Sequence, residues 1–227
     1  MARVIAKHEI RRNPLAEWLA SGVRFCQAHR GRITAAVAAA AILGIAGGGY
    51  WWYQERQEAD AARSLAGAYA VLREEQAGKP GTLEEAVKRF REVTEQHPGT
   101  RSAEEALIAV GNLYYESGKV DEALSSYNLY LTRHPRGRFR MMAGLGKAYA
   151  LEAKGDLQGA EQILSGVIEG DRDNPLAGEA YMSLARVYEG LKRPEDAMRV
   201  YGQVVDRFSQ TTWAQQALQR MNVLKPK

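Results

Sequence analysis

Carboxylate pairs and histidines are the side chains of this sequence that could perform acid–base chemistry. The pairs Glu84–Glu85 and Glu104–Glu105 each stand where a predicted helix begins, and carboxylates at that end of a helix complement its dipole. His97 and His134 lie 37 residues apart, each directly before a proline, so they mark equivalent turns of a repeating unit. These positions indicate structural roles, and we predict no catalytic residue.

Two further motifs could bind a phosphate group or a metal ion, and neither is complete. The segment from Gly144 to Lys147 has the glycines and lysine of a phosphate-binding loop, but it lacks the full spacing and falls inside a predicted helix. Cys26 is the only cysteine, so no intramolecular disulfide can form, and the histidines and cysteine lack the spacing of a zinc site. We therefore expect no metal, no cofactor and no enzymatic activity.

An alanine recurs every 37 residues through most of the chain. In one column it is followed, four and seven places later, by large apolar or aromatic residues, which is the spacing of one helix face. A second alanine column keeps the same interval, so each unit carries two helices with a small residue at a fixed crossing point. The columns are Ala86, Ala123, Ala160 and Ala197, and Ala106, Ala143, Ala180 and Ala217. Stacked helix pairs of this kind make grooves for partners more readily than catalytic pockets.

The clearest unit runs from Ser102 to Pro135 and resembles the tetratricopeptide repeat (TPR). In that repeat, the positions of Gly111 and Ala123 are those where the paired helices cross closely. We therefore predict an all-α fold, a TPR α-solenoid of about four helix pairs with a last helix from Thr212 to Leu224 that covers the open end. In the third unit we expect a slightly longer turn before Gly155.

The first helix of each TPR unit lines the concave face, which is the usual place for a bound peptide. The predicted binding residues on this face are Ile108, Asn112, Tyr115, Leu145, Tyr149, Met182 and Arg186, and Glu152 and Glu189 complete their columns. Such a strip could bind an extended or helical peptide, with hydrogen bonds from Asn112 and Arg186 and with the tyrosines as amphipathic anchors. The alternative is that these residues are ordinary solvated surface or pack between repeats.

Residues 33–53 carry no charged side chain. As a helix they would be about 31 Å long, which matches a hydrocarbon core of about 30 Å. The aromatic residues from Tyr50 to Tyr53 would lie at the membrane interface. Ala40, Gly44 and Gly48 recur at four-residue intervals and could let another helix approach closely. We predict a single transmembrane helix here, and the alternative is a signal peptide cleaved after Gly49.

Basic residues are concentrated before this span, with seven Lys and Arg against two acidic residues in residues 1–32. By the positive-inside rule, residues 1–32 form a cytoplasmic tail and residues 54–227 lie on the opposite side of the membrane. Because the tail carries the excess charge, we expect no nucleic-acid binding by the repeats. Leu15 to Ala28 could form an interfacial helix on the inner leaflet, or belong to a disordered tail. High helix propensity in Gln54 to Gln76 predicts that the span continues into the first repeat helix.

The segment from Gly49 to Tyr69, GYWWYQERQEADAARSLAGAY, together with a basic tail, one span and four repeats, resembles the YfgM-like family. Members of that family are ancillary subunits of the bacterial Sec translocon. The resemblance implies a periplasmic TPR domain anchored in the inner membrane. It also implies that the protein acts on exported chains together with translocon subunits and a PpiD-type membrane-anchored chaperone. The basic tail is longer here than is usual for the family.

Other functional classes stay open at this point. A scaffold for envelope assembly, similar to repeat proteins of the Tol-Pal or outer-membrane assembly systems, would have the same layout. A homo-oligomer could form through Gly44 and Gly48. An enzyme would need a pocket that the residue pattern does not indicate.

Overall fold

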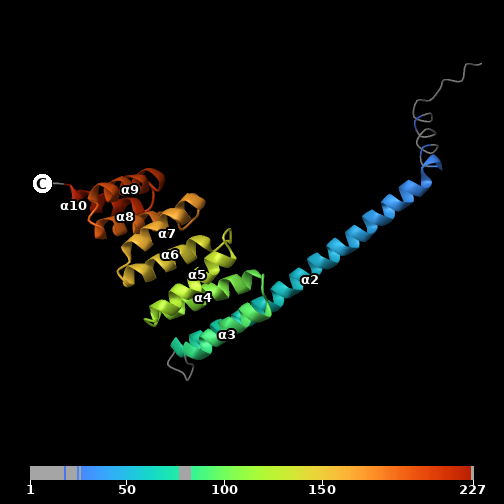
Figure 1. Cartoon of the computed structure of the whole chain (residues 1–227), viewed down its shortest axis with the longest axis horizontal. Coiled ribbons are helices and arrows are strands. Elements are labelled where there is room, and N and C mark those ends of the chain that lie inside the picture. Colours follow the sequence, from blue (N-terminus) through green and yellow to red (C-terminus); the bar gives the residue numbers. More distant parts are fainter. Residues whose placement is uncertain (1–17, 19–24, 26, 77–82, 226–227) are drawn as a thin grey trace, which may run out of the picture. The chain divides into compact units, whose positions relative to one another are not determined.

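The described chain is helical throughout. The computed structural model describes residues 18, 25, 27–76 and 83–225, and among them every regular element is an α-helix. The helices are α2 (Arg30–Gln76), α3 (Leu83–Gln96), α4 (Arg101–Glu116), α5 (Val120–Arg133), α6 (Arg140–Ala153), α7 (Leu157–Gly170), α8 (Ala177–Gly190), α9 (Pro194–Arg207) and α10 (Thr212–Leu224) (Figure 1). The predicted all-α fold is confirmed, and the last helix has the predicted bounds.

The chain divides into two compact units, residues 1–55 and 56–227, and α2 contributes to both. Because α2 is an uninterrupted helix of 47 residues, the expected continuation of the apolar segment into the first repeat helix is confirmed. Cys26 and most of the predicted interfacial helix, Leu15 to Ala28, lie outside the described residues.

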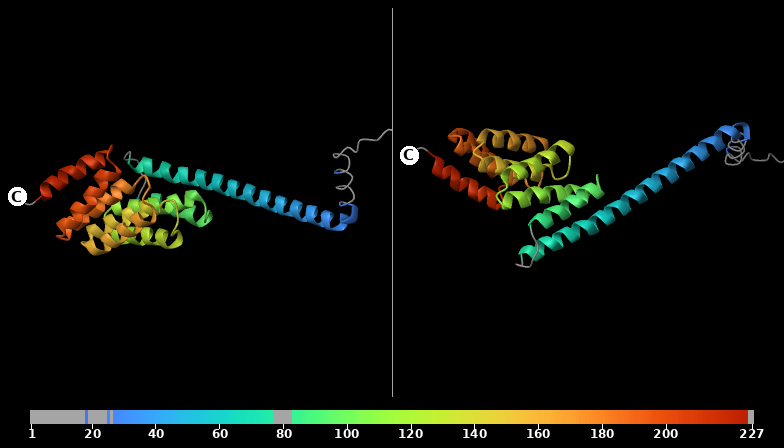
Figure 2. Two further views of the ribbon diagram at one scale, coloured as in Figure 1. Left: turned by 90° about the horizontal axis from the view of Figure 1, so that it is seen from above. Right: turned by 60° about the horizontal axis from the view of Figure 1, so that its bottom comes forward.

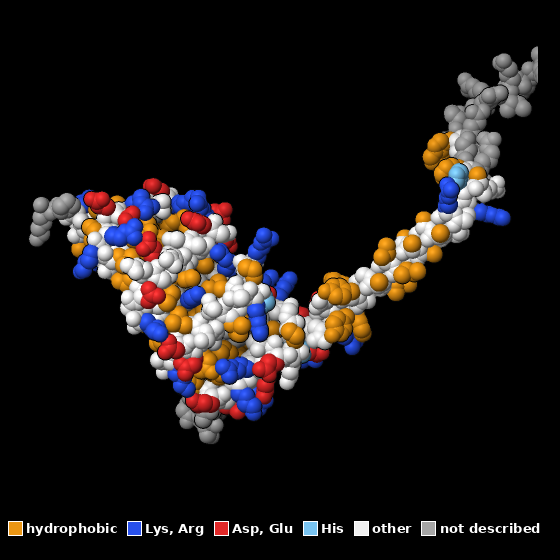
Figure 3. All heavy atoms as spheres, viewed as in Figure 1, with side chains coloured by type: hydrophobic (Ala, Val, Ile, Leu, Met, Phe, Trp, Pro, Cys, Tyr) orange, Lys and Arg blue, Asp and Glu red, His pale blue; other side chains and the backbone are white. Residues whose placement is uncertain are grey.

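The apolar part of α2 is exposed along its length. Every side chain in residues 34–53 is exposed, Ile45 by 77%, and Figure 3 shows the resulting row of hydrophobic side chains. Ala40, Gly44 and Gly48 lie on this surface, and a methyl group added at either glycine would meet no atom within 4 Å. Such a helix is not the buried core of a soluble domain. By length and composition it is the one described helix able to cross a membrane, a test that a signal sequence also passes.

The part of α2 after residue 55 forms the first helix of the repeat unit. Its Ala61, Leu65 and Ala68 are buried, and Leu65 and Ala68 share a hydrophobic core with α3 and α4. Tyr69 packs edge-on against Phe90 of α3, with ring centroids 4.9 Å apart. These contacts supply the first helix pair, whose leading helix lacks the sequence pattern of the later units.

Glu58 ties α2 to the start of α4. Its carboxylate accepts hydrogen bonds from the backbone N–H groups of Arg101 at 2.7 Å and Ser102 at 3.0 Å, and from the Ser102 hydroxyl at 2.8 Å. It thus satisfies N–H groups that a helix start leaves without partners. Burial raises the pKa of the Glu58 carboxyl, but the hydrogen bonds outweigh burial and hold this pKa below its ordinary value of 4.5.

Among the described residues of the second unit, four helix pairs follow one another, and α10 ends the stack. From α3 to α10 each helix packs against the next one (Figures 1 and 2). Turns of three residues join α4 to α5, α6 to α7 and α8 to α9, so the expected longer turn before Gly155 is wrong. The three turns have the same length because each contains one residue in the left-handed backbone conformation. These residues are Gly118, Gly155 and Lys192, which stand 37 residues apart and have φ values of 76°, 79° and 62°.

The side chain of Tyr127 fills the crossing between α4, α5 and α6. A Cβ atom on Gly111 would lie 2.6 Å from this ring, and one on Gly146 would lie 2.5 Å from it. The predicted close crossing at Gly111 is therefore confirmed. Gly144 has a similar role, because a Cβ there would collide with Val167. The glycines of the incomplete phosphate-loop motif are thus packing residues.

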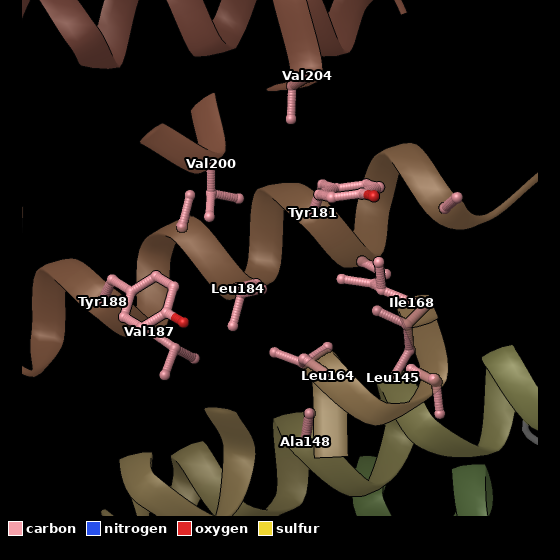
Figure 4. Close-up of a cluster of buried hydrophobic side chains, with 14 of the residues drawn as sticks. Leu145, Ala148, Leu164, Ile168, Tyr181, Leu184, Val187, Tyr188, Val200 and Val204 are labelled. Atoms are coloured by element: carbon pink, nitrogen blue, oxygen red, sulfur yellow. The ribbon is translucent and has the colours of Figure 1, made fainter. Parts of the chain in front are cut away.

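The largest core lies among α6 to α10. Figure 4 shows α8 running through it. Leu184 points toward Leu164 of α7, and Val200 of α9 lies on the opposite side of α8. Leu145 of α6 extends the same cluster toward the middle of the stack. Every unit therefore buries its apolar faces against the next unit.

The first helices form the inner side of the stack. Along it α4 contacts α6, α6 contacts α8 and α8 contacts α10, whereas no comparable contact joins the second helices in the described chain. The first helices are therefore closer together, and their exposed face is the concave one.

We expect Gly146→Ala to destabilise the protein by about 1–3 kcal/mol, because the new methyl group would overlap the Tyr127 ring. Gly202→Ala in α9 is the matched control. Nothing lies within 4 Å of a Cβ there, so it should be neutral or stabilise by up to about 1 kcal/mol. Thermal unfolding followed by circular dichroism measures both variants. An unchanged midpoint for Gly146→Ala would contradict the close crossing.

We expect Glu58→Ala to cost about 1 kcal/mol at pH 7, the usual effect of losing a helix cap. The folded-state pKa of Glu58 is lowered, so its contribution is complete above about pH 4.5 and is lost as the pH falls through the folded pKa. Urea unfolding between pH 7 and pH 3 should therefore show the wild type and variant converging at low pH. Asp60→Ala, which removes an exposed pair with Arg63, should change little. A difference independent of pH would exclude the carboxylate cap.

Candidate protein-binding groove

The seven predicted binding residues all lie on first helices. Ile108, Asn112 and Tyr115 belong to α4, Leu145 and Tyr149 to α6, and Met182 and Arg186 to α8. Helical spacing of three or four residues puts the members from one helix on a single face. They therefore share the concave side of the stack.

Two adjoining hollows follow this side. One of about 450 Å³ lies between α2, α4 and α6 and includes Tyr69, Glu105 and Ile108 in its lining. The other, of about 230 Å³, lies between α4, α6 and α8 and includes Tyr115, Leu145, Tyr149 and Glu179. Asn112, Glu116 and Met142 line both hollows, so the two are contiguous. We call them together the first-helix groove.

The predicted residues differ in depth within this groove. Ile108 and Leu145 are only 2% and 4% exposed, so they form its floor and cannot project toward a partner. This corrects the expectation of a uniformly presented strip, and the cause is that their column faces the neighbouring helices. Tyr115, at 36%, and Met142, at 38%, are the exposed large hydrophobic side chains of the groove.

The Asn112 side chain is held by a hydrogen bond from the buried Tyr127. The Tyr127 hydroxyl donates a 2.7 Å hydrogen bond to Asn112 Oδ1, which orients the amide and leaves its nitrogen with no hydrogen bond to any other described residue. Asn112 is itself exposed. It can therefore donate to the backbone carbonyl of a bound chain.

Tyr149 joins α6 to α8. Its hydroxyl donates to Glu179 Oε1 at 2.7 Å and lies 3.2 Å from the Ser183 hydroxyl. Burial raises the pKa of Tyr149 above 10, and the bond to Glu179 acts in the same direction. The ring is thus fixed while its side chain still lines the groove.

Arg186 and Met182 lie beside the groove and are not among its lining residues. The Arg186 guanidinium is 5.8 Å from the Tyr149 ring centroid and 3.5 Å from Glu152 Oε2. Met182 is partly buried against the C-terminal core. The sequence prediction that Arg186 binds a partner directly thus gains no support from its position, although it positions Tyr149.

Sequence reasoning did not assign Glu105, Met142 or Glu179 to the groove. Glu105, Met142 and Glu179 form a further column with the 37-residue interval, so the repeat itself was the signal that could have found them. Tyr69 is different. It comes from α2, which supplies no member of the alanine columns, and only folding brings its hydroxyl within 3.0 Å of Glu105.

A larger hollow lies between the second helices α3 and α5. It measures about 720 Å³, with Leu107, Val110 and Tyr114 of α4 in its lining. Charged residues of both signs line it, among them Arg91 and Glu122. Among the described residues, no group of three His, Cys, Asp or Glu side chains in either hollow or elsewhere could hold a metal ion.

Comparison with protein families identifies the repeat. A model described as "Tetratricopeptide repeat" matches residues 77–138, 111–175 and 145–210, which together cover more than half of the chain. The chain belongs to the tetratricopeptide repeat family. TPR domains generally mediate protein–protein interactions, and the fold is typically a non-enzymatic scaffold.

Solved structures share this fold at low sequence identity. TPR-like repeats from Podospora anserina match with a TM-score of 0.58 and 18% identity over 72% of this chain and 86% of that chain. MamA from Desulfovibrio magneticus matches with a TM-score of 0.55 and 20% identity over 72% of this chain and 82% of that chain. A TPR protein from Parabacteroides merdae matches with a TM-score of 0.56 and 16% identity over 71% and 60%. No curated protein sequence matches this chain.

We expect Tyr149→Phe to destabilise the protein by about 0.5–1.5 kcal/mol, because the half-buried Glu179 carboxylate loses its hydroxyl donor. Tyr115→Phe is the control, since no hydrogen bond joins the Tyr115 hydroxyl to another described residue, and it should leave stability unchanged. Urea unfolding measures both. Equal stability of the two variants would show that the Tyr149 bond does not join α6 to α8.

Proposed function

We propose that this TPR protein is a membrane-anchored, non-enzymatic adaptor that binds other proteins in the first-helix groove. The observation that carries the proposal is the pair of contiguous hollows on the concave side, with exposed Tyr115 and Met142 over a buried apolar floor. Aromatic and methionine side chains of this kind serve as anchors for a bound chain. Asn112 supplies a hydrogen-bond donor beside them.

The anchor in this proposal is the transmembrane helix over residues 33–53. Its support is a continuous, uncharged helical surface whose side chains are exposed from residue 34 to residue 53. Exposure of so much apolar surface to water is unfavourable, and lipid would cover it. The basic residues 1–32 would then be cytoplasmic, and residues 54–227 would lie on the opposite side of the membrane. Ala40, Gly44 and Gly48 would be free to contact another helix, from a partner or a second copy.

The setting in this proposal is the bacterial inner membrane, with the TPR domain in the periplasm. The resemblance of residues 49–69 to the YfgM-like family supports a place beside the Sec translocon, with a PpiD-type chaperone and exported chains as partners. Tethering the groove near an exit pore would raise its effective concentration for emerging chains. Weak contacts of low specificity would then suffice.

Capture of partners from membranes tests this function. We expect Tyr115→Ala with Met142→Ala to reduce recovery of translocon subunits and exported proteins roughly tenfold, as loss of about 1.4 kcal/mol would. Leu129→Ala with Leu218→Ala removes two apolar side chains outside the groove that are at least as exposed, and it should leave recovery unchanged. Quantitative mass spectrometry after mild-detergent affinity purification measures both.

Other outcomes of that purification separate the remaining functions. Equal recovery by both double variants would exclude the groove as the binding site. A single stoichiometric partner from a Tol-Pal or outer-membrane assembly system would favour an envelope scaffold and contradict the translocon role. Recovery of the protein alone would favour a homo-oligomer.

The size of the membrane-bound protein tests the anchor. We expect it to retain residues 33–53 and to migrate at full length on an immunoblot, because these residues hold it in the bilayer. A version that begins at Tyr50 is the size standard for cleavage after Gly49. Migration with that standard would identify a signal peptide.

A further inference from the structure

The first-helix groove carries charge of one sign. Its charged lining residues are Glu105, Glu116 and Glu179, and neither of its hollows includes a lysine or arginine in its lining. They lie on two first helices, with Glu116 at the junction of the hollows. A chain lying along the groove would therefore meet carboxylates over its whole course.

These carboxylates are not balanced from within the described chain. Glu105 and Glu179 accept hydrogen bonds from the neutral hydroxyls of Tyr69 and Tyr149, and no ion pair joins Glu105, Glu116 or Glu179 to any described cation. Elsewhere on the repeats, carboxylates do pair across helices. Lys119 binds Glu84 at 3.1 Å, and Arg193 binds Glu161 at 3.0 Å.

Arg186, the cation beside the groove, is already engaged. It pairs with Glu152 and contacts the Ser183 hydroxyl at 3.3 Å. The second oxygen of Glu152, Oε1, is buried and has no hydrogen-bond partner among the described residues. The Arg186–Glu152 pair thus includes an unsatisfied hydrogen-bond acceptor, and it adds no net positive charge beside the groove.

Apolar surface separates the carboxylates. Ile108 and Leu145 form the floor, and Met142 lies exposed between the hollows. An occupant must therefore satisfy two requirements, cationic side chains toward the glutamates and apolar side chains toward the floor. A purely apolar segment would bury the carboxylates without partners, and an acidic segment would be repelled.

We propose that the first-helix groove selects polypeptide segments in which lysine or arginine side chains alternate with apolar ones. This proposal rests on the proposed function, of which it names the bound class. The cations pair with Glu105, Glu116 and Glu179 while the apolar side chains contact the floor between them. Exposed and half-exposed pairs contribute about 0.2–1 kcal/mol each and are screened by salt, so binding weakens as ionic strength rises.

Three short fluorescent peptides test the selection on the full-length protein in zwitterionic nanodiscs, with empty nanodiscs as the blank. One alternates lysine with leucine and serine, and its twins carry glutamine or glutamate in place of lysine. Fluorescence anisotropy should give at least tenfold tighter binding of the lysine peptide than of the glutamine twin. Binding of the glutamate twin should be weaker still, and the lysine preference should decline with added salt.

A charge-matched pair of variants locates the effect. Glu116→Gln with Glu179→Gln should weaken binding of the lysine peptide roughly tenfold and leave binding of the glutamine twin unchanged. Glu95→Gln with Glu122→Gln removes the same charge from the hollow between α3 and α5 and should change neither. An effect of the second pair alone would overturn the assignment to this groove.

The remaining outcomes separate this proposal from the one on which it rests. Equal binding of the lysine and glutamine peptides, both weakened by Tyr115→Ala with Met142→Ala, would refute charge selection and leave the groove as a protein-binding site. Binding of none of the peptides, together with unchanged partner capture by that double variant, would refute both.

Discussion

The packing of the Tyr127 ring between Gly111 and Gly146 is the constraint on which the repeat domain depends. The ring occupies the space that two side chains would otherwise need, so three helices meet at one point with no room for a further carbon atom. Its hydroxyl is then directed to Asn112, at the surface of the groove. One buried side chain thus sets both the distance between repeats and the orientation of a candidate binding residue.

The groove is a consequence of unequal spacing in the stack. First helices touch one another, and the described second helices do not, so the stack curves with its first helices inside. Tyrosine hydroxyls bonded to Glu105 and Glu179 hold that inner face without neutralising it. Structural bonds and binding chemistry are therefore provided by the same side chains.

The fold could be predicted from the chain because the 37-residue alanine columns report helix crossings directly. Depth and charge within the groove could be predicted only in part. The burial of Ile108 and Leu145 depends on how closely the neighbouring helices approach, and the pairing of Arg186 with Glu152 joins residues 34 positions apart. Tyr69 reaches Glu105 from a helix that supplies no alanine to the repeat columns. Such relations arise from packing between units, which no local pattern encodes.

The most direct test of the central claim, that proteins bind in the first-helix groove, is site-specific photo-crosslinking in cells. A crosslinking side chain at Tyr115 samples the groove, and one at Leu129, exposed to a similar degree, samples the hollow between the second helices. The account predicts protein adducts, identified by mass spectrometry, from position 115 and few from position 129. Adducts from position 129 with none from position 115 would contradict it.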